Sequence, residues 1–361
     1  MEIFSAAEKD LQPSIQSQGG YEWWYFDGIS HDGKYTFVMI FYRGNPFSHR
    51  YIRALEEDSS RALPAQYPAV SIVLYKYGSP IYYSFTEYPK EKAKFNSSGP
   101  TIQMGKHTAK QEETEGGLQY VLDLDERLPS GDEFYSRLYY KGIKKPVLFD
   151  DGTSNVNADH GWNLTQPRAE VRGEFQLQTD GEKKGTINFK GTGYHDANAG
   201  KNPLRNDFKD WYWGRFHFEE TTLIYYLMNK RDERQEYAWL LDGGNNVIQS
   251  FEEANFGDYG YSVFGLYQSH KMEISAGSLS IQIQQSEVVD NGPFYRRFIS
   301  DAFLYDRDAE YLQKATGITE YIRPDRIYWR SFWPLVSMRI RQEDEKPHWV
   351  QRSKRLYRWT W

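Results

Sequence analysis

Short stretches that alternate apolar and polar residues fill this chain, and glycine, asparagine or aspartate separates one stretch from the next. Alternation of period two is typical of antiparallel strands, because successive side chains point to opposite faces of a sheet. The clearest predicted strands are residues 35–43, which follow the hairpin signal Asp32-Gly33, and residues 69–77 and 80–88, which flank a Gly-Ser turn. The pattern predicts an all-β chain.

Further strands are expected along the rest of the sequence, and helical signals are scarce. The additional predicted strands are residues 185–194, 221–229, 236–242, 279–285 and 337–342. Residues 308–314 are the best short helix candidate.

The length of 361 residues exceeds what one core usually supports, so two domains are expected. A weak echo between residues 22–27 and 210–215 suggests that one unit is used twice. Sheets of this size remove their edges by closing, which predicts two antiparallel β-barrels in tandem, over residues 1–195 and 196–361. The charged segment 196–209 would form the crossing between the barrels and place a pocket near the domain junction.

Aromatic residues make up 17% of the chain, with 29 Tyr, 21 Phe and 11 Trp, which suits a long apolar pocket for a hydrophobic small molecule. The absence of cysteine excludes disulfides, thiolate metal sites and cysteine nucleophiles, and fits a reducing compartment. The net charge of -6, with acids and bases interspersed, predicts no nucleic-acid partner.

The sequence shows no signal peptide and no run of eighteen uncharged apolar residues, so we expect a cytoplasmic protein that does not span a membrane. Residues 347–361 are basic, aromatic and free of acids. The favoured interpretation is a final barrel strand with a cationic edge. The alternative is peripheral contact with a membrane, where Trp settles at the interface and cations meet anionic lipid.

Asp196 is the leading candidate for chemistry, in the glycine-bounded stretch GTGYHDANAG that begins at Gly191. An aspartate beside glycine often caps a turn through backbone N–H groups. Surrounded by rings, however, a carboxyl group is poorly solvated, and burial can raise its pKa by up to ~3 to 5 units. A carboxyl group that keeps its proton at neutral pH can serve as a general acid.

A second cluster contains His160 and Trp162, for which a turn histidine beside a core tryptophan is the alternative. His160 and His195 each adjoin a carboxylate in the sequence, and with Asp196 and Asn198 they offer nitrogen and oxygen ligands. Their spacing matches no metal-site signature, so no metal is expected. The sequence also lacks a G-x-S-x-G elbow, a Walker motif and a nucleotide fingerprint.

Several motifs together resemble the carotenoid 1,2-hydratase (hydroxyneurosporene synthase) or AttH-like family. The matching elements are His160-Gly-Trp162, residues 167–171, G-x-G-Y-x-D-x-N-x-G over residues 191–200, Pro203-Leu204, Phe208, W-x-W-x-R over residues 211–215, and weaker matches at residues 22–25, 293–295 and 334–339. The middle block is specific, and the resemblance spans most of the chain. It implies two lipocalin-like β-barrels.

The resemblance also implies a hydro-lyase that needs no cofactor: a carboxylic acid protonates a terminal isoprenoid double bond, and water then adds. Asp196 would be that acid, supported by Tyr194, with His160 and Trp162 across the pocket. His160 would orient or deprotonate the water, and indole rings would stabilise the cation by ~2 kcal/mol or more. The implied substrate-binding residues are Trp211, Trp213, Tyr25, Trp24, His195 and Asn198.

Two other functions stay open from the sequence. A cyclase of the Diels-Alderase type would have the same two-barrel design and would work mainly by shaping a polyene in the pocket. A carrier would bind an apolar ligand without changing it.

Overall fold

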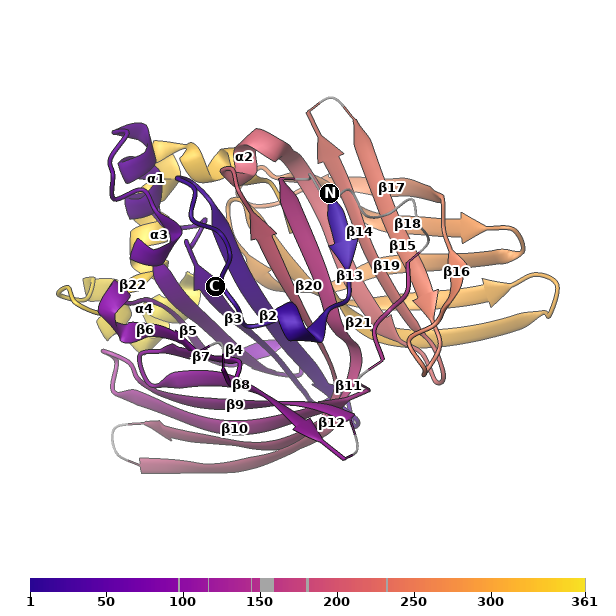
Figure 1. The fold of residues 1–361 in the computed structure, drawn as a ribbon, viewed down its shortest axis with the longest axis horizontal. Helices are drawn as coiled ribbons and strands as arrows, with labels where there is room; N and C mark the ends of the chain where they lie inside the picture. Colours follow the sequence, from indigo (N-terminus) through magenta and orange to yellow (C-terminus); the bar gives the residue numbers. More distant parts are fainter. Residues whose placement is uncertain are drawn as a thin grey trace. The chain divides into compact units, whose positions relative to one another are not determined.

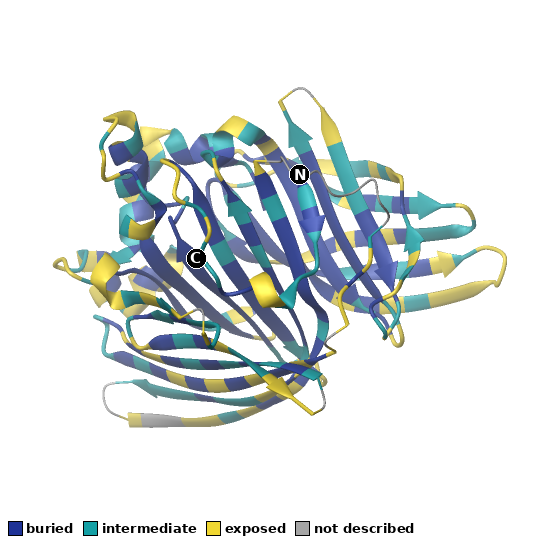
Figure 2. Ribbon diagram, viewed as in Figure 1, coloured by how far each residue is buried: buried dark blue, intermediate teal, exposed yellow. Residues whose placement is uncertain are grey.

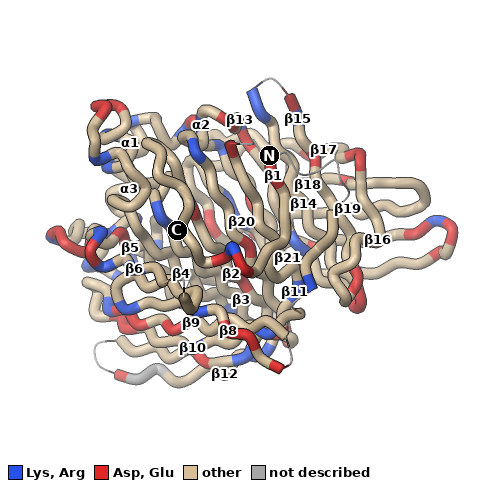
Figure 3. The backbone as a smooth tube through the Cα atoms, viewed as in Figure 1, with Lys and Arg blue, Asp and Glu red and all other residues tan. Residues whose placement is uncertain are grey.

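The structure is a computed structural model, drawn in Figure 1, that describes residues 1–96, 98–115, 117–143, 145–149, 159–179, 182–231 and 233–360. These residues are mostly β-structure, arranged as two curled half-barrel sheets, so the predicted all-β class is confirmed. Within them, no helix is both long enough and apolar enough to span a lipid bilayer. Basic and acidic residues are interspersed along the chain, as Figure 3 shows.

The larger sheet has thirteen strands in the described residues, in the order β22-β5-β4-β3-β2-β12-β11-β10-β9-β8-β7-β6, with β1 parallel to β11. Its strands are β1 (Glu2–Phe4), β2 (Tyr21–Ser30), β3 (Tyr35–Arg43), β4 (Pro68–Lys76), β5 (Ser79–Glu87), β6 (Ala93–Asn96), β7 (Thr101–Met104), β8 (His107–Thr114), β9 (Gly117–Arg127), β10 (Asp132–Gly142), β11 (His160–Thr179), β12 (Glu182–Gly200) and β22 (Arg341–Gln342).

The smaller sheet has nine strands among the described residues, in the order β16-β15-β14-β13-β21-β20-β19-β18-β17. They are β13 (Phe208–His217), β14 (Thr222–Lys230), β15 (Arg234–Leu241), β16 (Val247–Ser250), β17 (Glu253–Tyr261), β18 (Tyr267–Ala276), β19 (Leu279–Asn291), β20 (Tyr295–Asp306) and β21 (Tyr311–Ile322). The α-helices are short: α1 (His49–Glu56), α2 (Leu204–Asp207), α3 (Trp333–Arg339) and α4 (Lys354–Trp359).

The period-two pattern of the sequence becomes an alternation of burial along the strands. In β9 and β10, every second side chain is buried, which Figure 2 shows as alternating bands. Tight turns join neighbouring strands as the sequence predicted: Gly33 turns between β2 and β3 with a φ of +67°, and Gly78 turns between β4 and β5 with a φ of +70°. Both angles lie in the left-handed region that glycine adopts without steric cost.

Chain contacts divide the protein into two compact units, Met1–Pro203 with Trp333–Trp361, and Leu204–Phe332. This division differs from the expected ranges 1–195 and 196–361 in two respects. Strand β12 continues to Gly200, so the first unit extends past residue 195. The C-terminal segment belongs to the first unit because β22 pairs with β5 there, with Arg341 opposite Thr86.

Three expectations about local structure are wrong. Residues 308–314 are not a helix: they form the turn between β20 and β21 and the start of β21, because Tyr311 pairs with Asp306 across that hairpin. Residues 337–342 are the end of α3 followed by the two-residue β22. The segment 347–361 was expected to be a strand, but its described part, residues 347–360, contains the 3-10 turn Trp349–Arg352 and α4.

The segment 196–209, expected to cross between barrels, is also largely regular structure. Its first residues complete β12, α2 follows, and β13 begins at Phe208. Asp196 therefore lies inside a central strand of the larger sheet, and its side chain points to one definite face.

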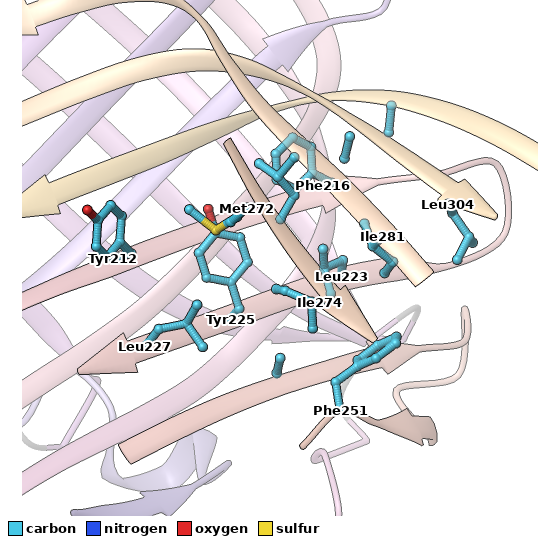
Figure 4. Close-up of a cluster of buried hydrophobic side chains, with 14 of the residues drawn as sticks. Tyr212, Phe216, Leu223, Tyr225, Leu227, Phe251, Met272, Ile274, Ile281 and Leu304 are labelled. Atoms are coloured by element: carbon cyan, nitrogen blue, oxygen red, sulfur yellow. The ribbon is translucent and has the colours of Figure 1, made fainter. Parts of the chain in front are cut away.

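Each unit has its own apolar core. In the first, rings from β2, β3, β11 and β12 contact one another, for example Phe37 with Phe175 and Phe189 at centroid distances of 5.5 and 5.0 Å. In the second, aliphatic and aromatic side chains pack together on the concave side of the curled sheet, as Figure 4 shows around Tyr225, Met272 and Ile281. The high aromatic content of the sequence is thus used largely for core packing.

Candidate active site

Strand β12 lies between β2 and β11 and carries the central candidate residues. Asp196 is paired with Tyr25 of β2, and Asn198 is paired with both Trp23 of β2 and Trp162 of β11. Because side chains alternate along a strand, Tyr194, Asp196 and Asn198 share one face of β12. The structure therefore brings Asp196, Tyr194, Trp162 and Asn198 together on one face of the sheet.

Three side chains donate hydrogen bonds to the Asp196 carboxyl group. Trp162 Nε1 and Tyr194 OH each lie 2.7 Å from Oδ2, and Asn198 Nδ2 lies 3.3 Å from Oδ1. Asp196 is 3% exposed, and Trp162 and Tyr194 are fully buried. An indole N–H can only donate, so Oδ2 is fixed as an acceptor and the carboxyl group is held in one orientation.

Burial raises the pKa of Tyr194 well above its ordinary value, and the nearby Asp196 carboxyl group raises it further. The phenol therefore keeps its proton across the physiological range and remains available to donate to Asp196.

His160 lies on the same face, at the end of β11. Gly200 separates it from Tyr21 in the sheet, because Gly200 is paired with His160 on one side and with Tyr21 on the other. A Cβ atom at Gly200 would lie 2.2 Å from the Tyr21 ring. Without that atom, the Tyr21 hydroxyl reaches across Gly200 and forms a hydrogen bond of 2.8 Å with His160 Nδ1. Sequence reasoning missed this role of Tyr21, because no local motif indicates it.

Two other glycines allow β2 to approach β12 closely. A Cβ atom at Gly191 would lie 2.1 Å from the carbonyl oxygen of Ile29, and one at Gly193 would lie 2.4 Å from that of Asp27. Any larger residue would push the two strands apart at the site. The glycines of the motif therefore allow two strands to lie close together, and they do not belong to a loop.

His195 points to the opposite face of β12 and does not share the surroundings of Asp196. Its ring is fully buried and stacks on Phe26 at a centroid distance of 3.8 Å. Its Nε2 lies 2.7 Å from Asp10 Oδ2, and its Nδ1 lies 2.8 Å from the carbonyl oxygen of Tyr25. Sequence reasoning missed Asp10, which lies far from His195 along the chain and in no recognisable motif.

The expected pair Trp24 and Tyr25 is divided between the two faces of β2. The Tyr25 ring lies edge-on to that of Tyr194 at 6.1 Å, beside Asp196. Trp24 lies on the other face, where it lines a cavity of about 270 Å³ together with Phe4 and Ala197. Adjacent strand residues cannot contact the same face of a sheet.

Trp211 and Trp213 belong to β13 of the second unit, where both are buried. Trp211 contacts the rings of Phe208 and Tyr226. The intervening Tyr212 belongs to the core of the second unit, so the two tryptophans face away from that core. Their predicted contact with substrate stays a prediction.

No group of three or more His, Cys, Asp or Glu side chains in the described residues is arranged to hold a metal ion. His160 and Asp196 lie on one face of the sheet and His195 on the other, so the four residues weighed as ligands do not form one set.

Comparison with known proteins places these features in a family. The family described as carotenoid hydratase CrtC matches residues 39–349. The chain is 26% identical over 325 residues to the hydroxyneurosporene dehydrogenase of Chlorobaculum tepidum, covering 86% of this chain and 84% of that protein. It is 24% identical over 316 residues to the acyclic carotenoid 1,2-hydratase of Cereibacter sphaeroides, covering 86% and 99%.

Solved structures share the fold at lower sequence identity. CghA with Sch210972 matches with a TM-score of 0.60 and 13% identity, over 85% of this chain and 89% of that chain. A putative AttH from Nitrosomonas europaea matches with a TM-score of 0.59 and 15% identity, over 84% and 93%. The match supports the lipocalin-like assignment of the fold.

Proposed function

Because this chain belongs to the carotenoid hydratase CrtC family, we propose that it adds water to a carbon–carbon double bond of an acyclic isoprenoid or similar polyene, without a cofactor. The observation that carries the proposal is the buried Asp196 carboxyl group, held by Trp162 and Tyr194 at 2.7 Å. A hydrocarbon has no polar group that an enzyme could activate. The enzyme must therefore supply a strong, oriented proton donor in a site without bulk water.

In the proposed mechanism, the hydrogen bonds favour one oxygen of Asp196 as the carrier of the proton. Oδ2 accepts from Trp162 Nε1, which cannot accept in return, and also from the Tyr194 hydroxyl. The proton of the neutral acid therefore belongs on Oδ1, where Asn198 Nδ2 is a longer contact at 3.3 Å. After the proton leaves, the two short hydrogen bonds to Oδ2 stabilise the carboxylate.

The proposed reaction has two steps. The Asp196 proton is transferred to the less substituted alkene carbon, and the π electrons form the new C–H bond, which leaves a tertiary cation. A water oxygen then adds to the cation and loses one proton to His160. For this, His160 Nδ1 donates to the Tyr21 oxygen, which leaves Nε2 as the acceptor. His160 then releases this proton to solvent and Asp196 takes one up from solvent, which restores both groups.

The test compares wild-type protein with the Asp196→Asn variant on acyclic polyenes, using mass spectrometry to detect the gain of one water. A positioned general acid contributes roughly 10² to 10⁴ in rate, so we expect a loss of at least about a hundredfold with little change in melting temperature. In D₂O, wild-type product should carry one deuterium on carbon. Asp125→Asn, at a half-exposed acid, is the matched control.

Other outcomes would favour the alternative functions. A cyclase that shapes its substrate would keep most of its activity in Asp196→Asn and would place no solvent deuterium on carbon. A carrier would return its ligand unchanged in both proteins. Either result would contradict the assignment of Asp196 as a general acid.

We also propose that the C-terminal segment contacts an anionic membrane, from which an apolar substrate can be drawn. Trp349 and Trp359 are 62% and 68% exposed, and Arg355 and Arg358 are exposed beside them in sequence. The buried Tyr357 anchors the segment through its hydroxyl, which donates to the Arg339 carbonyl oxygen at 2.9 Å. Arg355 and Trp359 then project from the side of α4 opposite Tyr357.

Vesicle sedimentation tests the membrane proposal. Wild-type protein should bind phosphatidylglycerol-containing vesicles more strongly than pure phosphatidylcholine vesicles, because cations near the surface each contribute about 1 kcal/mol. Arg355→Gln with Arg358→Gln should remove this preference, and Trp349→Ser with Trp359→Ser should weaken binding to both. Tyr261→Ser, at a tyrosine 75% exposed in the second unit, is the control. Equal binding of all variants would contradict the proposal.

A further inference from the structure

The second unit contains a buried arginine on the core-facing side of its sheet. Arg296 lies on β20 and is paired with Tyr321 of β21, which belongs to the apolar core. It is two residues from Phe298, another core residue, and therefore shares its face. Arg296 is 5% exposed, and its guanidinium group lies 4.8 Å from the centroid of the Phe298 ring.

Among the described residues, no acid forms an ion pair with Arg296. Its Nε and Nη1 atoms have no hydrogen-bond partner within the described part of the chain. Burial alone lowers its pKa to about 10. The adjacent Arg297 is different, because its Nε lies 2.9 Å from Glu320 Oε1 in a buried ion pair. One strand therefore presents a compensated arginine on one face and an uncompensated arginine on the other.

Two glutamines on the same concave side also have unused hydrogen-bonding groups. Gln268 of β18 donates from Nε2 to Gln285 Oε1 of β19 at 2.8 Å. The remaining Gln268 Oε1 and Gln285 Nε2 atoms are buried without a partner among the residues described. By contrast, Ser300 and Thr319 satisfy each other through a hydrogen bond of 2.7 Å.

These groups lower the stability of the folded protein if they serve only as parts of its core. A buried polar group without a hydrogen-bond partner destabilises the folded protein, and a buried charge without a counter-ion destabilises it further. Aliphatic side chains at the same positions would pack without that cost. A ligand that pairs with these groups would offset that cost.

We propose that the concave side of the second unit's sheet binds a carboxylate group of an otherwise apolar molecule. The Arg296 guanidinium pairs with the carboxylate, for which its planar fork of donors is well suited. Gln268 and Gln285 supply one acceptor and one donor to a further polar group of the same ligand, while core rings such as Phe298 contact its apolar part. This site goes beyond the proposed hydration, because a hydrocarbon substrate has no charged group for a cationic side chain to bind.

The test uses two matched polyenes, retinoate and retinol, which differ in the carboxylate. Binding to the full-length protein is followed by quenching of tryptophan fluorescence and by calorimetry at pH 8. We expect wild-type protein to prefer retinoate by at least about tenfold, the value of a charge-assisted hydrogen bond at the low end. Arg296→Met should abolish this preference, and Arg296→Lys should retain part of it.

Thermal unfolding separates a ligand site from a structural role. Arg296→Met should melt at the same temperature as wild type or higher, because it removes an uncompensated buried charge. Arg297→Met should melt at a lower temperature, because it leaves Glu320 buried without its partner. The proposal is overturned if wild-type protein shows no preference for retinoate, if Arg296→Met keeps it, or if Arg296→Met is destabilised as Arg297→Met is.

Discussion

Four buried carboxyl groups of the first unit are accommodated in four different ways. Asp10 contacts the His195 ring, and Glu22 accepts from Arg43 at 2.7 Å. Asp196 accepts from neutral donors, Trp162 and Tyr194. Glu87 is 2% exposed, and its nearest cation, Arg50, lies 3.6 Å away with a partly exposed side chain. Only an acid that lacks a buried cation is suited to hold a proton at neutral pH.

The pH dependence of the free energy of unfolding can test whether buried Glu87 holds a proton. Burial raises its pKa from 4.5 to about 7, against the smaller opposing effects of Ser48, Arg50 and Asn45. The folded protein therefore holds a proton that the unfolded chain has lost, so the stabilisation is complete below pH 4.5 and disappears as the pH rises through about 7. This change is worth about 3 kcal/mol, at 1.36 kcal/mol per pH unit.

Denaturant unfolding between pH 4.5 and 8 measures this effect. As the pH rises over this range, the unfolding free energy of wild type should fall by about 3 kcal/mol relative to that of Glu87→Gln, because the amide cannot titrate. Glu345→Gln, at an exposed glutamate, should follow wild type throughout. Parallel curves for wild type and Glu87→Gln would show that Glu87 is ionised across the whole range.

At the level of residues, the sequence can predict which side chains share a face only where the alternation along one strand determines it. The spacing of Tyr194, Asp196 and Asn198 places them on one face once the stretch is a strand. The contribution of Trp162 depends on the register of β11 against β12, and that of Tyr21 depends on a missing side chain at Gly200. Such relations arise between distant segments, and no local pattern specifies them.

At the level of elements, strands with strong turn signals were predicted well. The predicted strand 35–43 is β3, which is bounded by the turn at Gly33. Predictions failed where tertiary pairing overrides a short local preference. Residues 308–314 have helix-forming residues but pair across a hairpin, and seven residues are too few to sustain a helix alone.

Strand length was underestimated at the site itself. The expected strand 185–194 stops before Asp196, whereas β12 runs from Glu182 to Gly200. Small residues such as Ala197 and Ala199 weaken the strand signal of the sequence. The pairing with β2 and β11 on both sides supplies what the local sequence lacks.

For the whole molecule, the two units should differ in their ability to fold alone. Leu204–Phe332 is continuous in sequence and contains a complete nine-stranded sheet and core. Expressed alone, this fragment should unfold cooperatively, as followed by circular dichroism. Residues 1–203 alone should melt at a lower temperature than the same residues joined by a short linker to 333–361, which supply β22 and α4.

A short linker can join Pro203 to Trp333, because both residues lie near α1. Pro203 approaches Gly19, which lies beside Leu55 of α1, and Trp333 lies 5.5 Å from the guanidinium of Arg53. Equal melting temperatures with and without 333–361 would contradict this division and would favour independent folding of the N-terminal residues, as the sequence-based boundary at 195/196 implies.

The pairing of β22 with β5 joins two strands that are synthesised at different times. Thr86 leaves the ribosome long before its partner Arg341, because the entire second unit is made between Pro203 and Trp333. At about 5 to 20 residues per second, those roughly 130 residues take about 7 to 26 s. Throughout that interval the Thr86–Glu87 end of β5 lacks its partner strand and is open to strands of other nascent chains. A chaperone that shields this end of β5 would therefore act on the nascent chain before residues 333–361 emerge.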